Sequence, residues 1–225
     1  MLAAGRNDTT RAHDAVAKLC QAYWHPLYAY VRRRGCSPED AQDLTQGFFA
    51  HLLARNAVAT VHPDKGRFRS FLLASLNHFL SDEWDKARAQ KRDAGKTISF
   101  DTQTAETWLS QQSSQSFTPE QAFERRWAIT LLEQVYRKLE EEHRQQGRAA
   151  LFAALRTTLA GSANTAPYAA LARQLGLSEA AVKVTVHRLR QRYRALLRET
   201  IGETVSTREE VEDELRHLVK ILAGG

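Results

Sequence analysis

The chain has 225 residues, of which 43% are hydrophobic, and it carries a formal net charge of +6 with a pI near 9.5. Few glycines and prolines and many helix-forming residues predict an all-α protein, and the basic balance suits a polyanionic partner. Two cysteines without C-x-x-C spacing argue against a disulfide scaffold or zinc site, and no signal peptide or membrane-length apolar run is present. We therefore expect a cytoplasmic protein with no cofactor and no metal.

The charge is distributed in blocks along the chain. Residues 1–92 carry a net +5, residues 93–119 carry −2, residues 120–202 carry +6 and residues 203–225 carry −3. One continuous nucleic-acid partner that touches both basic blocks would explain this pattern. Two unrelated basic domains would give the same distribution.

The first basic block reads as three helices. Apolar residues recur every three or four positions from Asp14 to Arg34, and Gly35 then closes that helix. Ser37 is a plausible N-cap for the second helix, and Asp40 stands at its third position. Asp40, Asp43 and Gln46 share a face away from the apolar stripe. Either these acids only complement the helix dipole, or they form a docking face for a protein partner.

The third helix of this block follows Gly66 and changes character along its length. Its first half is apolar, and Phe71 and Phe79 are expected to be core residues. Its second half is polar and ends in basic residues, with Trp84 among the charges. Such a helix can contact phosphates and stack an exposed base, which draws attention to Asn77, His78 and Trp84.

A polar stretch at 93–118 reads as a linker to the second basic block. A helix is expected to begin after the cap residue Thr118 and to run to about Gln146, and a short amphipathic helix follows at 151–159. The tail from Thr207 to Leu222 reads as a further amphipathic helix, which either packs on the second block or binds a partner.

The stretch from Tyr168 to Arg198 has the outline of a helix-turn-helix. Gly176 stands where a helix-terminating residue needs a positive φ, and Ser178 can cap the next helix. Between Lys183 and Arg198 there are several cations and no acid. A short helix, a glycine turn and a basic second helix favour DNA binding over a merely solvated helical hairpin.

Three motifs in this order resemble an extracytoplasmic-function sigma factor of the sigma-70 family, and the resemblance covers nearly the whole chain. They are D-A-Q-D-L-T-Q-G-F-F at 40–49, G-R-F-R-S-F-L-L-A-S-L-N-H-F-L at 66–80 and the helix-turn-helix at 168–198. The resemblance implies a non-enzymatic transcription initiation factor that directs bacterial RNA polymerase core to promoters. It implies four segments: sigma domain 2 at 1–92, a linker at 93–118, sigma domain 4 at 119–202 and an acidic helical extension at 203–225.

The resemblance also assigns roles to individual residues. Docking on the clamp coiled coil of the largest polymerase subunit is implied for Asp40, Asp43, Leu44 and Gln46. Contact with the minus-ten element is implied for Asn77, His78, Phe79, Asp82, Trp84, Arg88, Lys91 and Arg92. Contact with the minus-thirty-five element is implied for Ser178, Lys183, Val184, Thr185, His187 and Arg188. The polymerase flap, and an anti-sigma factor or protein kinase as regulator, are the further partners implied.

Some questions stay open at the level of the sequence. Either Asn77 or His78 could read the exposed minus-ten base. The acidic tail exceeds the minimal two-domain pattern and could be regulatory. A stand-alone helix-turn-helix regulator that does not need polymerase is the main alternative. A nuclease using Asp40, Asp43 and Asp82 is a weaker one, because those acids are better explained as caps and docking charges.

Overall fold

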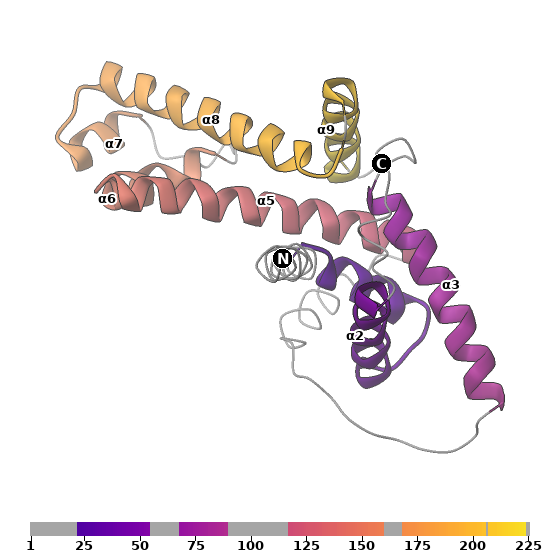
Figure 1. The fold of residues 1–225 in the computed structure, drawn as a ribbon. Helices are drawn as coiled ribbons and strands as arrows, with labels where there is room; N and C mark the ends of the chain where they lie inside the picture. Colours follow the sequence, from indigo (N-terminus) through magenta and orange to yellow (C-terminus); the bar gives the residue numbers. More distant parts are fainter. Residues whose placement is uncertain (1–21, 55–67, 90–116, 160–167, 206, 224–225) are drawn as a thin grey trace, which may run out of the picture. The chain divides into compact units, whose positions relative to one another are not determined.

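The computed structural model describes residues 22–54, 68–89, 117–159, 168–205 and 207–223, with the side chains of residues 87–89 left out (Figure 1). Within these ranges the chain forms helices and turns and no β-strand, which confirms the all-α prediction for this part. The chain divides into two compact units. The first unit comprises the described residues up to Thr130 and those from Thr204 onward, and the second unit is Leu131–Glu203.

The first unit contains helical residues 22–33, α2 (Pro38–Ala54), α3 (Phe68–Ala89), the beginning of α5 (Pro119–Gln145) and α9 (Arg208–Leu222). Its helix ends follow the sequence signals. Gly35 has a φ of +94° after the first helix, and the backbone N–H of Asp40 donates to Ser37 Oγ at the start of α2. Thr118 and Gln121 form the reciprocal hydrogen bonds of a capping box at the start of α5.

The core of the first unit is aromatic and aliphatic. Gly47 of α2 lets α3 approach closely, since a Cβ at this position would lie 3.2 Å from the ring of Phe79. That ring is only 8% exposed and packs 5.8 Å from Phe48, centroid to centroid. Other large buried side chains of this core include Trp24, Leu27, Tyr28, Leu72, Leu76, Leu80, Phe123 and Trp127.

The C-terminal helix α9 belongs to the first unit. Its buried carboxylate, Glu214, accepts a hydrogen bond from Arg69 Nε at 2.9 Å. Arg69 Nη1 also pairs with Glu124 at 2.6 Å, and the guanidinium lies 5.0 Å from the ring centroid of Trp127. His217 Nε2 lies 2.6 Å from the other oxygen of Glu124. A buried charge cluster therefore joins α3, α5 and α9.

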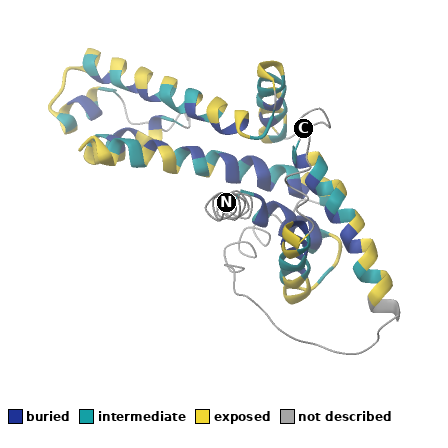
Figure 2. Ribbon diagram, viewed as in Figure 1, coloured by how far each residue is buried: buried dark blue, intermediate teal, exposed yellow. Residues whose placement is uncertain are grey.

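The second unit contains the rest of α5, α6 (Ala149–Leu155), a 3₁₀ turn η2 (Arg156–Thr158), α7 (Tyr168–Leu175) and α8 (Glu179–Gly202). Gly147 ends α5 with a φ of +69°. Figure 2 shows buried stripes on one side of α5 and of α8, and exposed residues on the other side. The buried stripes form one apolar core of Val135, Leu139, Phe152, Leu155, Leu171, Ala172, Val182, Val186, Leu189 and Leu196.

The two compact units do not coincide with the four segments expected from the sequence, which stay a prediction. The division falls inside α5, after Thr130, and not at residue 119. The reason is that Ala122, Phe123 and Trp127, in the first turns of α5, are buried in the first unit. Of the expected extension at 203–225, the described residues from Thr204 onward are part of the first unit, where Glu214 and Leu218 are buried.

None of the helices in the described ranges is long and apolar enough to cross a membrane.

Candidate polymerase and nucleic-acid interfaces

The predicted docking residues lie along α2 on the side away from its buried stripe. The stripe consists of Ala41, Thr45, Phe48, Phe49 and Leu52. Asp43 is exposed and lies opposite this stripe, while Leu44 and Gln46 are half-buried. Asp40 is exposed, and its carboxylate accepts a hydrogen bond from Ser37 Oγ at 2.8 Å. Asp40 thus has a role at the helix start, whereas the position of Asp43 leaves its charge available to a partner.

Asn77 lies at the edge of α3 that faces the end of the first helix. Tyr30 Oη donates to Asn77 Oδ1 at 2.8 Å, and Arg34 Nη1 donates to the same oxygen at 3.3 Å. Arg34 also donates to Tyr30 Oη at 3.1 Å, and its guanidinium lies 5.0 Å from the ring centroid of Trp84. The carbonyl oxygen of Asn77 is therefore occupied, and Trp84 is covered by a cation on one side. Sequence reasoning missed Tyr30 and Arg34, because only the fold brings them to α3.

The other predicted minus-ten residues divide into exposed and buried ones. His78 and Asp82 are exposed on α3. Phe79 is buried against α2, with its ring beside those of Phe48 and His51, so the structure gives it a core role, and its contact with DNA stays a prediction. The side chain of Arg88, and all of Lys91 and Arg92, lie outside the described residues.

In the second unit, α7 and α8 are joined by a tight turn at the place where the sequence predicts a helix-turn-helix. Gly176 has a φ of +64°, and Leu177 N–H donates to the Ala172 carbonyl at 3.0 Å, as in a helix-ending Schellman turn. Ser178 Oγ then accepts from the backbone N–H of Ala181 at 3.2 Å and caps α8. Leu171 of α7 and Val182 and Val186 of α8 share the apolar core, which fixes the two helices to each other.

The predicted minus-thirty-five residues lie on the first three turns of α8. Lys183, Val184, His187 and Arg188 are exposed. Lys183 pairs with Glu179 one turn earlier at 3.1 Å, an exposed ion pair that contributes little stability. Thr185 is half-buried, and its hydroxyl donates to the Ala181 carbonyl at 2.8 Å. Its side chain is thus turned toward its own helix, while the other four are open to a partner.

The arginines of α8 serve two different purposes. Arg190 donates from Nε and Nη2 to the Thr158 carbonyl, at 3.0 and 2.6 Å, and so satisfies the end of η2. Arg192 pairs with Glu142 at 2.6 Å and with Glu199 at 2.9 Å. Hydrogen bonding from Arg192 lowers the pKa of Glu142 below its usual range. Arg188 and Arg194, by contrast, have no ion-pair or hydrogen-bond partner among the described residues.

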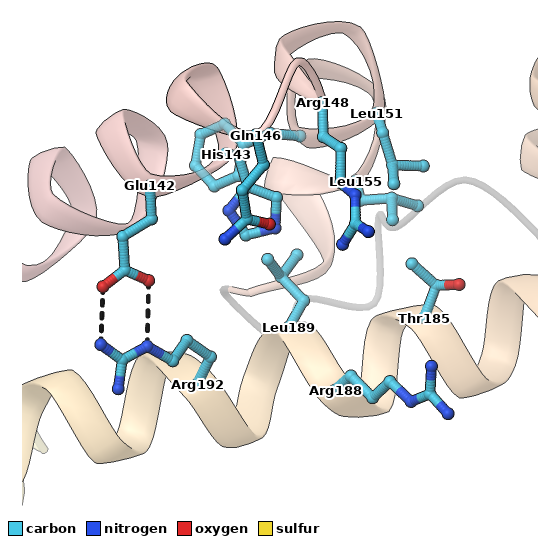
Figure 3. A pocket seen from close by; sticks show the side chains of 11 residues that line it. Glu142, His143, Gln146, Arg148, Leu151, Leu155, Thr185, Arg188, Leu189 and Arg192 are labelled. Carbon is cyan, nitrogen blue, oxygen red and sulfur yellow. Dashed lines mark hydrogen bonds and ion pairs between the residues drawn. The ribbon is translucent and has the colours of Figure 1, made fainter.

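An open pocket of about 420 Å³ lies beside α8, between it and the end of α5 with α6 (Figure 3). Arg148 projects into it from the start of α6, and Thr185 and Leu189 approach from α8. The Glu142–Arg192 ion pair closes one side. Among the described residues, no three His, Cys, Asp or Glu side chains are grouped so as to hold a metal ion.

Comparison with known proteins bears on part of the first unit. Residues 19–90 match the family model for sigma-70 region 2, a stretch that contains α2 and α3. No curated protein and no solved structure shows significant similarity to the chain. A sigma-70 region 2 domain binds RNA polymerase and recognises the minus-ten promoter element, and sigma factors act without enzymatic activity, as expected for this chain. Residues 19–90, about a third of the chain, are therefore similar to sigma-70 region 2.

Proposed function

We propose that this chain is an extracytoplasmic-function sigma factor that grips a promoter at two points in the cytoplasm. The first unit docks on polymerase core and opens the minus-ten element, and the second unit reads the minus-thirty-five element. One observation carries the proposal: a capped helix-turn-helix with an open basic face follows a sigma-70 region 2 domain in the same chain.

Docking is assigned to the exposed side of α2. Asp43 contributes an exposed negative charge at the centre of that side, with no ion-pair partner among the described residues, and Asp40, Leu44 and Gln46 border it. This arrangement suits a basic surface such as the clamp coiled coil implied by the family resemblance. The flap of polymerase would receive the second unit, which is a proposal from the same resemblance.

For the minus-ten element we assign the direct base contact to His78 and a positioning role to Asn77. The Asn77 carbonyl oxygen already accepts hydrogen bonds from Tyr30 and Arg34, whereas His78 is exposed. Asp82 lies one turn after His78 on α3, whereas Trp84 lies on the side of Asn77, and Arg88, Lys91 and Arg92 follow with the charge that backbone phosphates attract. Pocketing an unstacked base recovers part of the few kcal/mol that unstacking costs.

For the minus-thirty-five element, the exposed residues at the start of α8 enter the major groove. Arg188 is a candidate for a bidentate contact to guanine, and Lys183 and His187 add donors beside it. Ser178 caps the helix and so holds its N-terminus in place, and Thr185 stabilises the second turn. Arg148 and Arg194 are also exposed and supply positive charge for contacts with DNA phosphates.

Binding to polymerase core tests the proposal most simply. Purified chain is mixed with bacterial core polymerase, and the bound fraction is measured for the wild type, Asp43→Arg and Glu140→Arg. Glu140 is an exposed acid of the second unit and provides the matched control. We expect Asp43→Arg alone to lose core binding. If the wild type does not bind core but does bind DNA selectively, the chain is a stand-alone regulator instead.

A further inference from the structure

Two exposed apolar side chains stand at the beginning of α8. Large hydrophobic side chains are seldom exposed in the described part of this chain, and the exposed ones are Leu53, Leu177, Val184, Val219 and Leu222. Leu177 immediately precedes the cap of α8, and Val184 follows within two turns. Val184 is 50% exposed. The start of the helix proposed to read DNA thus exposes apolar side chains. A contact made only through electrostatic attraction to phosphates would not need them.

Val184 serves neither the core nor the helix turn. The core side of this helix is formed by Val182, Val186 and Leu189, each less than 5% exposed. Helical spacing places Val184 one turn after exposed Ala180, on the opposite side from that core. Exposed Lys183, His187 and Arg188 surround it. The exposed face of the first turns therefore has an apolar centre surrounded by Lys183, Arg188 and the imidazole of His187.

The chemistry of base edges limits what such a centre can recognise. In the major groove, the first residues of a recognition helix meet the base edges, and the thymine C5-methyl group is the apolar feature among hydrogen-bond donors and acceptors. An aliphatic side chain gains contact with that methyl group and leaves polar base edges unpaired. We infer that Val184 reads a thymine methyl group in the DNA element recognised by the second unit. This inference rests on the proposed function.

Deoxyuridine substitution tests the inference because it removes the methyl group and nothing else. Promoter duplexes are first selected from a random library by the full chain in complex with core polymerase. Each thymine of the upstream element is then replaced singly by deoxyuridine, and the affinity of the complex is measured for the wild type, Val184→Ala and Val219→Ala. Val219 is 66% exposed on α9 of the first unit, so its substitution is the matched control.

We expect one deoxyuridine position to weaken wild-type binding about three- to five-fold, the loss that corresponds to one buried methyl group. Val184→Ala is expected to bind the thymine promoter with a similar loss and to show no further loss at that position. Val219→Ala is expected to keep the full deoxyuridine effect. Because Val184 is exposed, its variant is expected to keep the wild-type melting temperature.

Two outcomes overturn the inference: no single deoxyuridine changes wild-type affinity more than two-fold, or Val184→Ala retains the wild-type deoxyuridine effect. In both cases selection of a promoter has succeeded, so the proposed function stands. If the complex selects no upstream element at all, the proposed function fails together with the inference.

Discussion

The two units handle their cations in different ways. In the first unit, Arg69 is buried and saturated by Glu124 and Glu214, with Trp127 against the guanidinium. In the second unit, the arginines lie at the surface of α8, where Arg190 and Arg192 are engaged and Arg188 is open. This contrast between paired and open arginines shows that a stretch of basic sequence does not form a uniform DNA-binding surface. Some cations hold the fold, and only those left without partners are available to phosphates and bases.

The largest effect is expected from Glu214→Ala. It leaves Arg69 buried with half of its carboxylate partners, and breaking a buried ion pair costs about 3–5 kcal/mol. Urea unfolding followed by tryptophan fluorescence measures this loss, because Trp24, Trp84 and Trp127 belong to the first unit and the second unit has no tryptophan. Glu209→Ala, at an exposed acid of α9, is the control. Equal stability of the two variants would show that the cluster is not structural.

A second comparison separates the arginines of α8. Arg190→Ala leaves the Thr158 carbonyl without its donor and is expected to lower the stability of the second unit by about 1.5–3 kcal/mol. Arg188→Ala is expected to leave stability unchanged but to reduce promoter affinity by about 1–3 kcal/mol, with core binding intact. Thermal unfolding followed by circular dichroism measures the stability of each variant, and a promoter-binding assay measures its affinity for DNA. A loss of stability from Arg188→Ala would contradict this division.

A smaller effect is expected at the edge of α3. Tyr30→Phe removes one hydrogen bond to Asn77 Oδ1, at a cost of about 0.5–1.5 kcal/mol, and so loosens Asn77 without exposing a new surface. Permanganate footprinting of unpaired thymines in the open complex should show reduced minus-ten melting at unchanged core affinity. His78→Ala is expected to reduce melting further. If Asn77→Ala is worse than His78→Ala while Tyr30→Phe has no effect, then Asn77 reads the base directly.

The smallest expected effect is on how the stability of the second unit depends on pH. The pKa of Glu142 is lowered chiefly by hydrogen bonding from Arg192, so this pair contributes stability above the unfolded-state pKa of about 4.3 and loses it as pH falls through the lower folded-state pKa. Glu142→Gln is therefore expected to narrow the stability difference between pH 7 and pH 3 in the second unit. The shift in melting temperature at the two pH values measures it. An unchanged difference would mean that the exposed pair is screened.

Local signals in the sequence predicted much of the fold. Positive-φ glycines at 35, 147 and 176 and the caps Ser37, Thr118 and Ser178 lie where propensity rules put them, because each acts through neighbouring backbone groups. The partners of buried charges could not be predicted. Arg69 and Glu214 are 145 positions apart, and α9 looks like any acidic amphipathic helix until the fold brings them together.

The same distinction holds for the candidate sites. The exposed residues at the start of α8 follow from helical periodicity once Val182 and Val186 are recognised as core. Phe79 was assigned to DNA by family resemblance, although its apolar spacing favoured the core in which it lies. Tyr30 and Arg34 were missed because their contact with Asn77 depends on how two helices pack.

Transcription from reconstituted holoenzyme tests the central claim that the two units grip separate promoter elements. Core polymerase with wild-type chain is used to select active promoters from a library randomised over both elements, and the selection is repeated with Arg188→Ala. We expect the wild type to enrich two separated motifs, and the variant to keep the minus-ten motif while losing preference in the upstream one. Enrichment of a single motif, or loss of both motifs with Arg188→Ala, would contradict the account.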